Sequence, residues 1–131
     1  MFYCLVVGSR EFANYEQMEV NLDKLLNNQK EVTIVSGGAK GADTLAEKYA
    51  ANRGYECIVF KADWNKYGKS AGVIRNEQMQ KFIAQHEKRC CVAFWDGRSK
   101  GTYSNFDLAK KYNNPLRIVL FEKKRENSIE R

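Results

Sequence analysis

The sequence has few of the residues on which several common kinds of protein depend. Among its 131 residues there are one proline, one histidine and four cysteines, and no two cysteines form a C-x-x-C pair. The single histidine, His86, leaves little material for a histidine-based metal site or a Ser-His-Asp triad. No apolar run approaches the length of a membrane span, and the first residues lack the basic segment of a signal peptide. We therefore expect a cytoplasmic protein with no metal, no cofactor and no membrane partner.

The scarce reactive side chains have simple interpretations. His86 stands among polar residues at the end of a predicted helix, so we expect it to be solvated or to cap that helix. The cysteines lie in or beside apolar runs, which predicts small buried residues in a reducing compartment; they are Cys4, Cys57, Cys90 and Cys91.

What the sequence does contain is enough for one globular domain. Hydrophobic residues make up 44% of the chain, which is long enough to bury a core without disulfides. We predict one domain over residues 1–121 and a polar tail over 122–131. The net charge of +6 is compatible with an anionic ligand or nucleic acid, although the tail and the helix surfaces supply part of it.

Five apolar runs alternate with four helical patterns. Strands are predicted over 2–7, 32–35, 55–60, 90–95 and 116–121. Helices are predicted over 15–28, over 42–53, from Ser70 or Ala71 onward, and over 102–112, with a long loop over 61–69. This alternation predicts an α/β fold: a single Rossmann-like, three-layer domain with a five-stranded parallel sheet in the order 3-2-1-4-5.

A first glycine turn, residues 36–43, lies between the second strand and the helix after it. Its three glycines tolerate positive φ, and the following helix offers unpaired N–H groups, a combination that binds phosphate. The spacing matches neither the dinucleotide nor the Walker fingerprint. A purely structural turn would have the same sequence, so both interpretations stay open.

Polar residues also follow other strands at the same predicted edge of the sheet. Ser9 and Arg10 follow the first strand, and a second glycine turn, residues 95–102, follows the fourth. In this topology the turns meet at the carboxyl edge, where ligands bind. Arg75 and Asn76, in the first turns of the third helix, should face the same place. Three aromatic residues offer either base-stacking surfaces or core packing: Trp64, Tyr67 and Trp95.

Five ordered motifs together resemble the YspA-type, YpsA-related branch of the SLOG superfamily. They are Gly8-Ser9-Arg10-x-Phe12, Ser36-Gly-Gly-Ala-x-Gly-Ala-Asp43, Ala62-Asp-Trp64, Ala71-Gly-x-x-Arg75-Asn76-x-x-Met79 and Phe94-Trp-Asp-Gly-x-Ser-x-Gly-Thr102. The resemblance implies a Rossmann-like fold and a nucleotide-derived ligand. The pocket residues we expect are Gly8, Ser9, Arg10, Ser36, Gly37, Gly38, Ala39, Gly41, Ala42, Asp43, Asp63, Trp64, Arg75, Asn76, Trp95, Asp96, Gly97, Ser99, Gly101 and Thr102.

The same superfamily contains Lonely Guy phosphoribohydrolases, which implies an alternative as an N-glycosidic hydrolase of nucleoside monophosphates. Where those enzymes carry a catalytic Glu, this chain has Asn105. Cleavage would then need another carboxylate, Asp43, Glu47 or Asp96, with Arg75 holding phosphate.

A third alternative is single-stranded nucleic-acid binding, as in the DprA-like members of the superfamily. Relatives in the superfamily often form dimers, and no exposed stripe in this sequence decides between a monomer and a homodimer.

Overall fold

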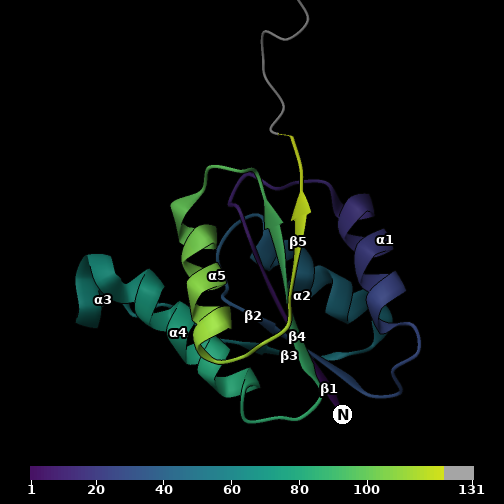
Figure 1. Ribbon diagram of the computed structural model, residues 1–131. Helices are drawn as coiled ribbons and strands as arrows, with labels where there is room; N and C mark the ends of the chain where they lie inside the picture. The colour runs from purple at the N-terminus through teal and green to yellow at the C-terminus, as the bar shows by residue number, and fades with distance from the viewer. Residues whose placement is uncertain (123–131) are drawn as a thin grey trace, which may run out of the picture.

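The fold is a five-stranded parallel sheet between two layers of helices (Figure 1). The computed structural model describes residues 1–122, so the predicted tail lies, apart from Glu122, outside the described residues. In chain order the elements are β1 (Phe2–Gly8), α1 (Tyr15–Leu26), β2 (Val32–Ser36), α2 (Ala42–Arg53), β3 (Glu56–Val59), α3 (Trp64–Tyr67), the 3-10 helix Gly68–Ser70, α4 (Ala71–Ile83), β4 (Arg89–Trp95), α5 (Lys100–Lys111) and β5 (Leu116–Leu120).

The strand order β3-β2-β1-β4-β5 confirms the predicted topology. β1 lies at the centre, with Cys4 paired to Ile34 of β2 and to Cys90 of β4. Cys4 and Val6 pack on the α1–α2 side, whereas Leu5 and Val7 pack on the α4–α5 side. Because helices cover both faces, β1 reads in sequence as a continuous apolar run.

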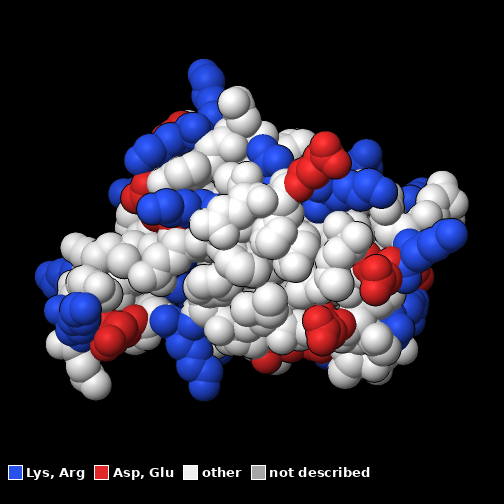
Figure 2. Space-filling view, turned by 90° about the horizontal axis from the view of Figure 1, so that it is seen from below, with Lys and Arg blue, Asp and Glu red and all other residues white. Residues whose placement is uncertain are grey.

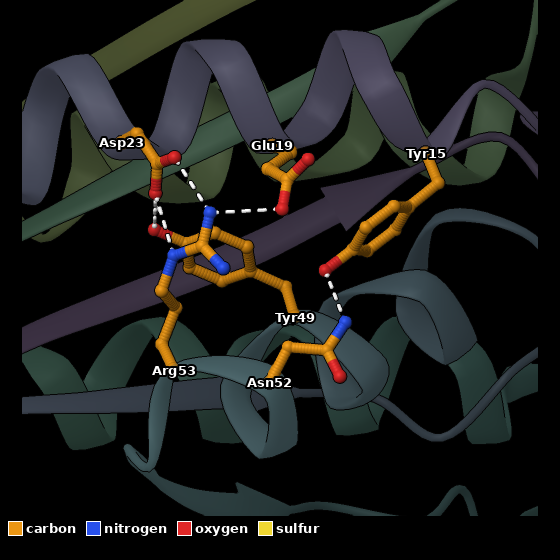
Figure 3. Close-up of polar contacts among 6 residues, drawn as sticks. All are labelled: Tyr15, Glu19, Asp23, Tyr49, Asn52 and Arg53. Atoms are coloured by element: carbon orange, nitrogen blue, oxygen red, sulfur yellow. Dashed lines mark hydrogen bonds and ion pairs between the residues drawn. The ribbon is translucent and has the colours of Figure 1, made fainter.

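A polar clamp holds α1 against α2 (Figure 3). The Arg53 guanidinium donates to both carboxylate oxygens of Asp23 at 2.7 and 3.0 Å and to Glu19 at 2.8 Å. The Tyr49 hydroxyl donates to Asp23 at 2.7 Å, and the Asn52 amide donates to the Tyr15 hydroxyl. The hydrogen bonds from Arg53 lower the pKa of Asp23, so the clamp stays ionised at neutral pH.

Three local predictions are wrong. Cys57 is exposed, because β3 is an edge strand with only part of its surface covered. His86 stacks on the ring of Tyr3 at 3.8 Å and neither caps α4 nor points freely into solvent; its Nε2 is buried with no partner among the described residues. The expected loop over 61–69 contains α3, whose first turn is capped by Asp63 accepting from the Lys66 amide.

The edge of the sheet at which the strands begin carries charges of both signs. The strands end at the top of Figure 1, and Figure 2 looks from below at the opposite edge. There, Lys, Arg, Asp and Glu lie around an uncharged centre, so no continuous basic surface covers that face.

Over residues 1–122 no helix is long and apolar enough to span a membrane, and no group of three or more His, Cys, Asp or Glu is placed to hold a metal ion.

Candidate functional site

A pocket of about 570 Å³ opens at the carboxyl edge of the sheet, beside the end of β1. This is the switch point of the strand order, where β1 leads one way to β2 and the other way to β4. Residues predicted from sequence that line it are Gly8, Ser9, Arg10, Ala39, Asp43, Trp64, Arg75, Asn76, Asp96, Ser99, Gly101 and Thr102. Its volume falls within the usual range for small-molecule sites, roughly 300–1,000 Å³.

The other predicted site residues lie around the pocket and do not line it. Asp63 caps α3, and the Trp95 ring packs against Tyr103 and Phe106 while its N–H donates to the Ser99 carbonyl. Gly97 lies in an open turn at φ +83°. The remainder belong to the first glycine turn: Ser36, Gly37, Gly38, Gly41 and Ala42.

Three backbone N–H groups of the first glycine turn donate to other groups of the protein. The Gly38 amide donates to the Ser36 hydroxyl at 3.3 Å, and the Ala39 amide donates to Asp43 Oδ2 at 3.2 Å. The Ala42 amide donates to the Ser9 carbonyl at 3.2 Å. The sequence-based expectation that this turn offers its amides to a phosphate therefore lacks those three donors.

Close packing explains the glycines of this turn better than ligand approach does. A Cβ on Gly37 would lie 2.7 Å from Arg75 Nη1 and 2.8 Å from Asp43 Oδ2. Gly41 has φ +78° and faces the backbone of Ser9 and Arg10 at a separation too small for a side chain. The turn is therefore closely packed, and the absence of a side chain at Gly37 leaves room for Arg75 and Asp43 beside each other.

Asp43 and Arg75 form the charged wall of the pocket on this side. Asp43 is only 6% exposed, and burial raises its pKa, an effect that the Ala39 amide and the Arg75 charge oppose. Burial also lowers the pKa of Arg75. Arg75 Nη1 donates to the Gly37 carbonyl at 2.6 Å and Nε donates to Asn76 Oδ1 at 3.0 Å, which fixes the guanidinium. Within residues 1–122, Nη2 has no acceptor.

Asn76 lines the pocket mainly as a support for other groups. It is 5% exposed, accepts from Arg75, and donates to the Gly101 carbonyl at 3.3 Å and the Ser104 hydroxyl at 3.1 Å. It thereby ties α4 to the start of α5.

The start of α5 is the open counterpart of the first turn. Asp96 Oδ1 accepts from the amides of Arg98 and Ser99, and these bonds lower the Asp96 pKa, the Arg98 amide most. The Ser99 side chain makes no capping bond to the helix. Among the described residues, no acceptor faces the amides of the first helical turn, which are those of Lys100, Gly101 and Thr102.

Ser9 adds a buried donor to this open end. Its side chain is 2% exposed, and Oγ makes no hydrogen bond of standard geometry within residues 1–122, although its proximity contributes to the low pKa of Asp96. Buried hydroxyls normally have partners, so an unpaired one in a pocket indicates a place for a ligand atom.

Several residues that line the pocket were missed from the sequence: Val7, Glu11, Lys69, Gly72, Val73, Met79, Arg98 and Asn105. Helical spacing could have found some of them. Gly72 lies three residues before Arg75, Met79 lies three residues after Asn76, and Asn105 lies four residues after Gly101. Lys69 and Arg98 had no such signal, because they belong to a 3-10 turn and a loop.

Comparison with known proteins agrees with this architecture. A model of the YspA, cpYpsA-related SLOG family matches residues 4–67. The Gene 61 protein of Mycobacterium phage D29 is 33% identical over 118 residues, which cover 86% of this chain and 91% of that protein.

Two solved structures align with most of this chain, and the first of them shows the same fold. DNA processing protein A from Helicobacter pylori, described for its single-stranded DNA binding mode, aligns with a TM-score of 0.67 at 20% identity and covers 96% of this chain and 67% of its own. A predicted tRNA methyltransferase subunit from Methanocaldococcus jannaschii aligns with a TM-score of 0.47 at 17% identity, covering 92% of this chain and 70% of its own.

Proposed function

Because the chain belongs to the YspA, cpYpsA-related SLOG family, we propose that its pocket binds a nucleotide or nucleotide-derived ligand through phosphate, ribose and base. The protein would act as a sensor or processing protein for that ligand. The phosphate would lie at the start of α5 and not at the first glycine turn.

One observation carries this proposal: the buried Ser9 hydroxyl, which makes no hydrogen bond of standard geometry within the described residues, shares the pocket with the open amides at the start of α5. A helix N-terminus attracts anions through its N–H groups and its dipole. Arg10, Arg98 and Lys69 line the same pocket and supply positive charge that offsets the Asp96 carboxylate. A phosphate is the ligand group that uses all of these donors together.

The remaining groups suit a ribose and a base. Asp96 keeps a low pKa and is therefore an acceptor for ribose hydroxyls at neutral pH. Trp64 is 52% exposed at the pocket rim and offers a stacking surface for a base.

The test is a panel of nucleoside monophosphates, NAD and ADP-ribose, followed by thermal stabilisation and by release of free base in the same samples. We expect at least one member to stabilise the protein. Ser9→Ala should weaken that binding by about tenfold or more, because it removes a hydrogen bond to a charged group. Ser70→Ala is the matched control, since Ser70 is exposed and makes no capping bond. Equal weakening in both variants would refute the assignment of Ser9.

Asp43 favours a second candidate, hydrolysis of the N-glycosidic bond. Asp43 places a buried carboxyl in the pocket, where burial raises its pKa against the opposing charge of Arg75, and a carboxyl is the kind of group that serves as general acid in such a cleavage. Base release that Asp43→Asn abolishes would make the protein a hydrolase with Asp43 as general acid. Stabilisation without release leaves a binding protein. If oligonucleotides alone bind, with a steep salt dependence, single-stranded nucleic acid becomes the ligand.

A further inference from the structure

A row of polar side chains runs through the protein between α4 and α5 and ends at the pocket. Arg89 Nε donates to Asn114 Oδ1 at 2.6 Å, and Asn114 Nδ2 donates to Gln80 Oε1 at 2.9 Å. Gln80 Nε2 donates to Asn105 Oδ1 at 3.0 Å. Asn114, Gln80 and Asn105 are 6%, 0% and 2% exposed. Only Asn105 of this row lines the pocket.

The direction of each amide in the row is fixed by Arg89 at one end and by two backbone carbonyls. Asn114 Nδ2 also donates to the Gln80 carbonyl at 2.9 Å, and Gln80 Nε2 also donates to the Asn105 carbonyl at 3.5 Å. A guanidinium only donates hydrogen bonds, so Asn114 must turn its oxygen to Arg89 and its NH₂ to Gln80. Gln80 must then turn its NH₂ to Asn105. The two ends of an amide have nearly the same shape, and such a chain of partners is what distinguishes them.

The consequence appears at the pocket. The Asn105 side-chain oxygen accepts from Gln80, and residues 1–122 provide no acceptor for its NH₂ group. This nitrogen is not among the buried atoms of those residues that lack a partner, so it is accessible. Asn105 lies one turn beyond Gly101 and Thr102 on α5, so this NH₂ continues the donors at the start of the helix into the pocket.

We propose that Asn105 determines ligand specificity as a hydrogen-bond donor whose orientation is set by Gln80, Asn114 and Arg89, so that the ligand atom it meets is an acceptor oxygen. The inference rests on the proposed function and deepens it. A carbonyl oxygen of a base and a phosphoryl oxygen share this chemistry. An amino group at that place would meet a second donor and be disfavoured.

The orientation is tested without any ligand. In ¹⁵N-resolved NMR spectra, the side-chain NH₂ of Gln80 and Asn114 should exchange slowly with water, because both are buried and bonded. The NH₂ of Asn105 should exchange at least about tenfold faster. An Asn105 NH₂ as slow as that of Gln80 would overturn the inference.

The specificity is tested with two nucleotides that differ mainly at one base position, inosine and adenosine 5′-monophosphate, which carry a carbonyl and an amino group there. Asn105→Asp keeps the acceptor for Gln80 and replaces the donor by an anion. A loss of about tenfold for inosine monophosphate alone identifies a base carbonyl, and an equal loss for both identifies a phosphoryl oxygen. If Asn105→Asp changes the affinities for both nucleotides by less than about twofold, this inference is overturned while the proposed function stands. Failure of both nucleotides to bind the wild-type protein would overturn this inference, and failure of the whole panel would overturn the proposed function with it.

The row itself is tested at a distance. Gln80→Met removes the donor to Asn105 with little change of side-chain volume. We expect this variant to lose part of the nucleotide affinity that Asn105→Asp loses. The NMR signal of the Asn105 NH₂ group should also shift. Glu77→Gln is the control: Glu77 accepts from Lys111 and Tyr112 across the same helix pair, outside the pocket. The same NMR spectra show whether each variant is folded. If folded Gln80→Met and Glu77→Gln bind the nucleotide with equal affinity, the role of the row is refuted.

Discussion

The two glycine turns look alike in sequence and differ in the structure. In the first turn three amides are donated to groups of the protein itself, and side chains or backbone crowd Gly37 and Gly41. In the second turn the Arg98 and Ser99 amides donate to Asp96, but the helix amides of Lys100, Gly101 and Thr102 have no acceptor among the described residues. A Cβ at Gly97 or Gly101 would meet nothing within 4 Å. A glycine-rich turn before a helix therefore indicates an anion site only when its amides are free.

The largest expected difference between the turns is in stability. Gly41→Ala should lower the free energy of unfolding by about 3 kcal/mol or more, because φ +78° is strained for alanine and the Ser9–Arg10 backbone blocks the methyl group. Gly101→Ala lies inside α5 in open space and should raise it by up to about 1 kcal/mol. Urea unfolding of Gly41→Ala and Gly101→Ala measures the change in the free energy of unfolding for each. Changes of the same sign in the two variants would contradict this prediction.

The carboxylates of the two turns should respond to acid in opposite directions. Burial raises the pKa of Asp43, so its contribution to stability falls as pH rises from about 4 through its folded pKa. Amide donors lower the pKa of Asp96, so its contribution is present above about pH 4 and is lost as pH falls through its folded pKa.

Two isosteric variants test these signs. Asp43→Asn should stabilise the protein at pH 7, on the order of 1 kcal/mol, and the gain should shrink toward pH 4. Asp96→Asn should destabilise it slightly at pH 7, and that difference should disappear in acid. Denaturation between about pH 2 and 8 gives both differences, because Asp96 titrates below about pH 4 in the folded protein. A stabilising Asp96→Asn would show that the second turn does not hold an ionised carboxylate.

The smallest expected effect is the response of the free protein to inorganic phosphate. Millimolar phosphate should shift the amide NMR signals of Gly101 and Thr102, because these residues line the pocket and their amides have no acceptor among the described residues. The signals of Gly38 and Ala39 should stay in place, because Ser36 and Asp43 already accept from them. Shifts confined to the first turn would reverse the assignment of the phosphate site.

Most of the fold could be predicted because strong local patterns carried it. The apolar run over 2–7 and Gly54, which ends α2 at φ +71°, show their structural role directly in the sequence. Asp63, whose side chain caps the first turn of α3, was a local signal for a helix that the prediction over 61–69 missed. Cys57 and His86 depend on which strand lies at an edge and on what stacks there, and neither is a local property.

The site divides in the same way. Its location follows from strand order and from which turns carry polar residues, so Ser9, Arg75 and Asp96 were found. Which amides remain free could not be predicted, because Asp43 reaches back to the Ala39 amide only in the folded turn. The hydrogen bonds of the row from Arg89 to Asn105 join residues that lie 25 or 34 positions apart, without any motif spacing.

The central position of β1 has a consequence for synthesis on the ribosome. Its partner β2 emerges soon after it, and the β1–β2–β3 half can assemble once residue 59 has appeared. The other side of β1 waits for β4, which begins at residue 89. The pocket draws its walls from both halves, so a nascent chain acquires it only after β4 and the start of α5 have docked. Ligand binding during translation would therefore report the docking of β4 and of the start of α5 on the first half of the sheet.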